Sequence, residues 1–372
     1  MSLGSFNQTL KAKCLKLASY IKKREWLIAI VLALTLIIIG VGFGYENNKI
    51  IPSSPSPIAH YLSETKNPLN FLAEWDGANY LAIAKHGYNN VQLVNYFPLY
   101  PLSIHIVNLV VSSPLDSAVL IAWVFLVGAI YFYIKIIKLF FKVSDNLEAL
   151  RATLPFVLYP TGIFLIATYT ESMFAFFALG AIFFALKKRY IPAGLMTMLA
   201  TATHINGILV LLLITMILIE EKTKPIRTFI SFIIGSLGLV AYSIYAQIKY
   251  HNPIEYLYTQ RNHGWLRHSL LSRFASFSVL DYLFLIIVLY AAIYWWKKRK
   301  SFSIYAGLYL LIPLVGGQFG GFPRYTLMVF PVPLMVYSYL RDKKFAYLAM
   351  IAITAICWTY FLLQYAGGYV GG

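Results

Sequence analysis

The chain has 372 residues, of which 59% are hydrophobic and only 12% are charged, and its mean hydropathy is +0.68. Its apolar runs are too many and too long for the core of a soluble domain, so the sequence predicts a protein that crosses the membrane many times. The net charge of +17 does not indicate a nucleic-acid partner, because the basic residues form clusters between the apolar runs, as in the cytoplasmic loops of membrane proteins.

The N-terminal region predicts one membrane helix followed by a large loop. Residues 1–26 are basic and precede the apolar run 27–44, an arrangement that puts the N-terminus in the cytoplasm. Residues 45–115 then form the first extracytoplasmic loop. The short apolar segment 97–112 contains prolines and a histidine, so we expect it to lie along the membrane surface rather than to cross.

One stretch of this loop, AEWDGANYLAIAKHGY at residues 73–88, is unusually polar. It contains two carboxylates, a lysine and a histidine in an otherwise apolar chain. A helix through this stretch puts Asp76, Asn79 and Tyr80 on one face, because residues three and four apart are neighbours on a helix. An ionisable side chain held near a bilayer is a functional hypothesis by default, so Asp76 is a candidate site residue.

The rest of the chain alternates apolar runs with basic clusters. If all clusters face the cytoplasm, the chain crosses the membrane an even number of times between any two of them. Residues 190–219 then form a tight hairpin whose apex, TATHING, lies below the outer surface of the membrane. We expect about eleven membrane helices, with roughly nine and thirteen as the limits. They cover residues 27–44, 116–134, 150–168, 173–187, 190–203, 207–219, 228–248, 279–296, 302–319, 325–340 and 345–363.

This topology gathers the polar segments on the extracytoplasmic side of a single membrane domain that covers residues 1–372. Besides the first loop, these segments are the turn TYTES at 168–172, a second extracytoplasmic loop at 249–278 and the turn GGQFGGFPRY at 316–325. The hairpin apex joins them from within the membrane. One outward-facing cavity formed by several loops is the economical interpretation.

Five motifs, in order along the chain, carry a resemblance to a known family. They are EWDGANYLAIAKHGY, YFPLYPLSI, ATYTESMFAFFAL, YTQRNHGWLR and FPRYTLMVFP. Together they resemble the PIG-V-type mannosyltransferases, which are relatives of GPI mannosyltransferase II. One motif departs from the family pattern: where the family often has T-R-x-x-G, this chain has Thr203-His204-Ile205-Asn206-Gly207. A titratable histidine replaces a permanent cation there, which affects how a phosphate or another group is bound.

The resemblance implies an all-α, polytopic glycosyltransferase of the GT-C type, with juxtamembrane helices in the first loop. It also implies an inverting transfer of a sugar, typically mannose, from a polyprenyl phosphate to a glycolipid or glycan. Asp76 is then the expected general base for the acceptor hydroxyl. Cations should stabilise the leaving phosphate, and Arg324 is the leading candidate because guanidinium binds phosphate bidentately. Further candidates for binding the donor phosphate or substrate are Arg267, Lys85, His204, Glu171, Tyr325, Gln260, Trp265, Asn79 and Tyr80.

Several of these candidates have a second interpretation. Glu171 is expected either to bind the acceptor sugar or a site arginine, or to cap a helix. Trp265 is either an anchor at the membrane interface or a stacking platform for sugar. Lys85 and Arg267 are alternatively basic residues that meet solvent or lipid headgroups.

No cofactor is expected, because the sequence has no D-x-D motif, no Gly-rich phosphate loop and no H-E-x-x-H motif. Cys14 and Cys357 lie in a basic tail and an apolar run, so they indicate neither a metal cluster nor a disulfide framework.

The expected partners are the lipid-linked donor, the acceptor and the bilayer, with the oligomeric state left open. A transporter or lipid flippase is the alternative from another class, and a non-catalytic subunit of a glycosylation complex is a third. The small outer loops favour a prokaryotic plasma membrane with an extracytoplasmic site over the endoplasmic reticulum.

Overall fold

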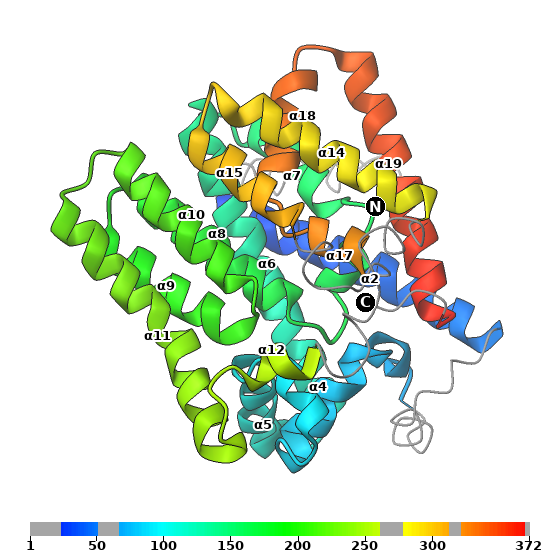
Figure 1. The fold of residues 1–372 in the computed structure, drawn as a ribbon. Coiled ribbons are helices and arrows are strands. Elements are labelled where there is room, and N and C mark those ends of the chain that lie inside the picture. The colour runs from blue at the N-terminus through cyan, green and yellow to red at the C-terminus, as the bar shows by residue number, and fades with distance from the viewer. Residues whose placement is uncertain (1–23, 51–66, 261–277, 312–320, 369–372) are drawn as a thin grey trace, which may run out of the picture.

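The computed structural model describes residues 24–50, 67–260, 278–311 and 321–368. In these ranges all regular secondary structure is helical and there is no strand, which confirms the all-α prediction (Figure 1). In the view of Figure 1, the helices labelled α4, α5 and α12 lie together at the bottom, and the connection between α18 and α19 lies at the top.

Five of the described helices are long and apolar enough to cross a membrane, and they identify an integral membrane protein. The helix α6 lies deepest among them, because 61% of its most apolar window is buried, against 22–39% for the other four. The number of crossings, expected to be about eleven, stays a prediction. The five helices are α2 (Glu25–Ile50), α6 (Pro114–Phe141), α11 (Pro225–Tyr250), α14 (Val279–Trp296) and α19 (Lys344–Ala366).

Shorter helices fill the space between the long ones and form the first loop. The hairpin α9–α10 has the predicted boundaries to within one residue, and the segment that we expect along the membrane surface contains a helix, α5. The shorter α-helices are α4 (Asp76–His86), α5 (Leu99–Val111), α7 (Asn146–Val157), α8 (Glu171–Leu186), α9 (Tyr190–Thr203), α10 (Gly207–Glu220), α12 (Glu255–Gln260), α15 (Lys300–Tyr309), α17 (Phe322–Thr326) and α18 (Pro331–Leu340). Three 3-10 helices, η1 (Asn70–Ala73), η2 (Val91–Asn95) and η3 (Gly162–Leu165), lie between them.

Three predicted helices are wrong in extent, and proline accounts for two of them. The helix expected over 302–319 is α15, which ends at Tyr309. The helix expected over 150–168 ends at Val157, because Tyr159 precedes Pro160 and a residue before proline disfavours the α conformation. The helix expected over 325–340 is split into α17 and α18. Pro331 lacks the backbone N–H that would continue a helix, and it is the first residue of α18 instead.

The ends of helices that carry basic residues contact one another. Arg299, after α14, binds Glu220 and Glu221 at the end of α10, with a distance of 2.9 Å in each pair. Lys138 near the end of α6 binds Glu25 at the start of α2 at 2.8 Å. Each pair joins two ends that the positive-inside rule puts on the same side of the membrane, so the structure agrees with that rule at these two places.

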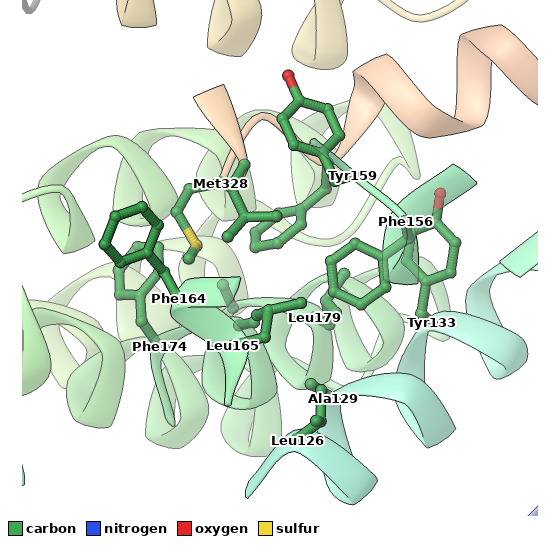
Figure 2. Close-up of a cluster of buried hydrophobic side chains, with 14 of the residues drawn as sticks. Leu126, Ala129, Tyr133, Phe156, Tyr159, Phe164, Leu165, Phe174, Leu179 and Met328 are labelled. Atoms are coloured by element: carbon green, nitrogen blue, oxygen red, sulfur yellow. The ribbon is translucent and has the colours of Figure 1, made fainter. Parts of the chain in front are cut away.

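The core lies where α6, α7, α8 and the segment around Met328 meet (Figure 2). Tyr133 of α6 stacks on Phe156 of α7, with ring centroids 4.6 Å apart. Lipid tails are as apolar as these side chains, so close packing rather than exclusion of water stabilises the assembly. Gly238 of α11 illustrates the fit: a Cβ atom there would lie 2.1 Å from the carbonyl oxygen of Met198 in α9.

Candidate active site

The backbone of the polar stretch turns sharply just before Asp76. The helix η1 ends at Ala73, and Trp75 then adopts a positive φ of 53°, which is rare for a residue other than glycine. The sequence predicted a helix that begins at residue 73, but α4 begins at Asp76 because of this turn. Asp76, Asn79 and Tyr80 still share one face of the helix, as predicted.

A turn before α8 holds this segment in place. The backbone N–H and the hydroxyl of Thr168 both donate to the carbonyl of Leu72, at 2.9 and 3.0 Å. The Tyr169 hydroxyl donates to the carbonyl of Glu74 at 3.0 Å. A Cβ atom on Gly77 would lie only 2.5 Å from the Thr168 hydroxyl oxygen, so this approach requires glycine. Three hydrogen bonds thus hold the segment directly before α4.

Asp76, Glu171 and Arg324 form one charged cluster. The Arg324 Nη1 atom lies 2.7 Å from Asp76 Oδ2, and its Nε atom lies 2.5 Å from Glu171 Oε1. The side chains of Arg324 and Glu171 are 3% and 5% exposed, whereas that of Asp76 is 22% exposed. These three residues come from the starts of α4 and α8 and from α17. Two acidic side chains therefore share one guanidinium.

Aromatic rings confine the Arg324 guanidinium. Its carbon lies 4.8 Å from the ring centre of Tyr169 and 5.4 Å from those of Phe164 and Tyr325. Such rings attract a cation through their quadrupole and restrict where it can move. With Nε and Nη1 engaged by carboxylates, Nη2 is the nitrogen through which Arg324 can meet another anion.

The second oxygen of Asp76 has its own partner, Tyr96. The Tyr96 hydroxyl donates to Asp76 Oδ1 at 2.8 Å, and the Asn79 side-chain amide donates to the Tyr96 oxygen at 2.7 Å. The Tyr80 ring meets the Tyr96 ring edge-on, with centroids 5.1 Å apart. The sequence did not single out Tyr96 as a site residue, although it is the first residue of the YFPLYPLSI motif.

His204 lies in the loop between α9 and α10, beside Phe174 and Tyr325. Desolvation, with a smaller contribution from the Arg324 charge, lowers the pKa of His204 to about 3. Its Nδ1 atom accepts a hydrogen bond from the backbone N–H of Asn206 at 3.1 Å, so the proton of the neutral ring is on Nε2. His204, which the sequence predicted as a titratable cation, is therefore neutral and can donate a hydrogen bond through Nε2. Together with Glu171 and Arg324 it lines a cavity of about 10 Å³.

Other predicted residues lie apart from the cluster or outside the described ranges. Lys85 is exposed near the end of α4, about 13 Å along the helix axis from Asp76 at 1.5 Å per residue. Gln260 is the last residue of α12. Trp265 and Arg267 lie outside the described residues. In the part of the chain that the structure describes, no three or more His, Cys, Asp or Glu residues are grouped to hold a metal ion.

An apolar groove of about 510 Å³ lies next to the cluster, between α5, α9 and α11. Leu102, Met198, Leu237 and Ala241 line it. Tyr88 lines it too, and its hydroxyl donates to the backbone carbonyl of Tyr96 at 2.6 Å. Tyr96 therefore links Tyr88, which lines the groove, to the carboxylate of Asp76.

These features define an integral membrane protein with a charged cluster held between its helices. The family model for mannosyltransferase (PIG-V) matches residues 30–291, and the chain belongs to that family. This confirms the resemblance found in the motifs.

Individual relatives match over shorter stretches. GPI alpha-1,6-mannosyltransferase 2 of Mus musculus is 29% identical over 164 residues, which are 42% of this chain and 33% of that protein. The Cricetulus griseus protein of the same name is 28% identical over 149 residues, which are 38% of this chain and 30% of that protein. The chain thus matches about a third of the length of these relatives. By structure it is similar to the oligosaccharyltransferase of Archaeoglobus fulgidus, with a TM-score of 0.43 and 12% identity over 91% of this chain and 53% of that one.

Proposed function

We propose that the protein transfers mannose from a polyprenyl phosphate to a hydroxyl of a glycolipid or glycan, with inversion at the sugar C1. Family membership supports the class of reaction, and no finding favours the transporter alternative. The observation that carries the proposal is the partly exposed carboxylate of Asp76, held between Arg324 and Tyr96 next to an apolar groove.

The chemical step is a single displacement. The acceptor oxygen attacks C1 of the sugar while its proton passes to Asp76 Oδ2, which acts as general base. The bond between C1 and the phosphate oxygen breaks, and its electron pair leaves with the phosphate. A phosphate leaving group needs no proton, so one base suffices, in contrast to the carboxylate pair of a glycoside hydrolase.

Arg324 links the two charge changes of this step. Before transfer its Nη1 atom neutralises Asp76. When Asp76 takes up the proton it loses its charge, and at the same moment the leaving phosphate gains charge. The guanidinium is then available to the phosphate where that charge develops. We retain Arg267 and Lys85 as candidates for further contacts with the phosphate, and we propose that His204 contributes an uncharged Nε2–H donor.

The groove between α5, α9 and α11 suits the hydrocarbon chain of the donor. Its walls are apolar, and the exposed side chains Leu102 and Leu237 extend it onto the outer surface of the helices, which lipid covers. Tyr96 lies where this groove meets the cluster. A donor with its chain in the groove would bring its phosphate toward Arg324.

We propose that the site faces the extracytoplasmic or lumenal side of the membrane. The cluster lies at the ends of α8 and α9 that are opposite to their basic ends at Lys187 and Arg189. The positive-inside rule then puts the cluster outside. Short outer loops favour a prokaryotic plasma membrane, and the endoplasmic reticulum is the alternative.

The test is a transfer assay with the purified protein and a radiolabelled mannosyl polyprenyl phosphate. The variant Asp76→Asn keeps the shape of the side chain and removes the base, so its rate should fall about 10²- to 10⁴-fold. The matched control is Asp116→Asn, because Asp116 lies in the first turn of α6 and binds Asn67 rather than a residue of the cluster. Transfer by Asp76→Asn at the wild-type rate, or labelling of a cysteine at residue 76 only from the cytoplasm, would contradict the proposal.

A further inference from the structure

The hydroxyl of Tyr96 has one proton, and its surroundings decide where that proton points. The Nδ2 atom of Asn79 has hydrogens and can only donate, and it donates to the Tyr96 oxygen at 2.7 Å. The proton of Tyr96 is therefore directed to Asp76 Oδ1, 2.8 Å away. Burial and the neighbouring charge of Asp76 raise the pKa of Tyr96 well above its usual value, so the phenol stays protonated over the working pH range.

The ring of Tyr96 is fixed from several directions. Its backbone carbonyl accepts hydrogen bonds from the hydroxyls of Tyr88, at 2.6 Å, and Tyr242, at 3.5 Å. Its ring packs edge-on against Tyr80. These contacts hold the phenol oxygen in place relative to α4.

The two donors to Asp76 behave differently during transfer. Arg324 is charged, and in the proposed step it turns from Asp76 to the leaving phosphate. Tyr96 is neutral and has no charge to follow. When Oδ2 takes the proton, Oδ1 becomes the carbonyl oxygen of the carboxyl group and still accepts a hydrogen bond. The bond from Tyr96 therefore fits both protonation states.

We infer that Tyr96, oriented by Asn79, is the positioning residue of Asp76, which it holds by Oδ1 so that Oδ2 takes the acceptor proton. This role rests on the proposed function. It predicts that loss of the hydroxyl slows the chemical step more than it weakens donor binding, because the base loses its orientation at the reacting oxygen.

The experiment compares Tyr96→Phe with Tyr256→Phe. The control removes a hydroxyl in the neighbouring aromatic cluster, where Tyr256 contacts Phe97 and Ser243 and lies away from Asp76. For Tyr96→Phe we expect kcat to fall about tenfold with little change in KM. The acidic limb of the pH–rate profile should move up by about one pH unit, because a lost hydrogen bond favours the protonated carboxyl group. Tyr256→Phe should leave both unchanged.

A second variant and a second measurement keep the inference testable. Asn79→Ala leaves Tyr96 in place but frees its proton to turn, so a smaller shift in the same direction is expected. Infrared titration of the Asp76 carboxyl band, assigned by its loss in Asp76→Asn, follows the same shift without substrate. The inference is overturned if the acidic limb of the pH–rate profile stays at its wild-type position in both Tyr96→Phe and Asn79→Ala. It is also overturned if Tyr256→Phe moves that limb as far as Tyr96→Phe does. A wild-type protein that transfers nothing from any mannosyl lipid overturns the proposed function instead.

Discussion

The charged cluster makes a quantitative prediction about stability. In the variant Arg324→Met, the carboxylates of Asp76 and Glu171 lose their cation. The Glu171 side chain is only 5% exposed, so its carboxylate stays buried without that partner. Removing one partner of a buried ion pair costs about 3–5 kcal/mol in the free energy of unfolding, because the other charge stays buried without compensation. We expect Arg324→Met to lower the free energy of unfolding by an amount in this range.

The source of that cost can be located with second substitutions. Glu171→Gln in the Arg324→Met background removes the buried charge and should recover about 2 kcal/mol, within the usual range for residues in direct contact. Asp76→Asn in the same background should recover less than about 1 kcal/mol, since Asp76 is 22% exposed and water screens its charge. The difference between the two rescues follows directly from the difference in exposure.

The assay is equilibrium unfolding in mixed micelles, with the denaturing detergent as the variable, for the wild type, three single variants and two double variants. Additive effects of Arg324→Met and Glu171→Gln would show that the two side chains do not interact in the folded protein. Equal rescue by Asp76→Asn and Glu171→Gln would refute the assignment of the cost to the buried carboxylate.

Three further predictions concern the groove, the histidine and the tight turn. Ala241→Trp fills the groove and should raise KM about tenfold for a long-chain donor but not for a short-chain one, whereas Val240→Trp on the lipid-facing side of α11 should change neither. The pKa of His204 is lowered in the folded state, so the unfolded state binds the proton first as the pH falls. The free energy of unfolding should therefore decrease as the pH drops from about 6.5 toward 3. The variant His204→Gln should make that decrease smaller when unfolding is measured at several pH values. Gly77→Ala should cost about 1–3 kcal/mol and reduce transfer, because the new Cβ meets Thr168.

Where local signals agree, the sequence predicts the fold closely. The helix α14 spans 279–296, as expected, because Ser278 and Asp281 form a capping box at its start and basic residues follow its end. The hairpin α9–α10 follows from the basic clusters on either side of residues 190–219, which require an even number of crossings between them. Two of the three helices that differ in extent, those expected over 150–168 and 325–340, contain prolines that interrupt a helix within an apolar run.

The site could be predicted in part only. Spacing on a helix put Asp76 and Asn79 on one face, and motif order indicated Glu171 and Arg324. Their meeting could not be read from spacing, because Asp76 and Arg324 are 248 residues apart in the chain. The turn at Trp75 is also a tertiary effect, since it depends on hydrogen bonds from a distant segment. Lys85 belongs to the same motif as Asp76, yet helix geometry carries it away from the cluster.

The two carboxylates of the cluster have different surroundings, and under the proposed mechanism this difference gives them different roles. Glu171 is almost fully buried, so its pairing with Arg324 Nε is costly to break and persists through the reaction. Asp76 is more exposed and can meet an acceptor hydroxyl. When Asp76 becomes neutral, Glu171 still holds the guanidinium in place, so Arg324 can respond to the phosphate without leaving the site. If Arg324 were paired with Asp76 alone, it would lose its only ionic contact when Asp76 takes up the proton. Because Arg324 also binds Glu171, it keeps one ionic contact throughout the proposed step.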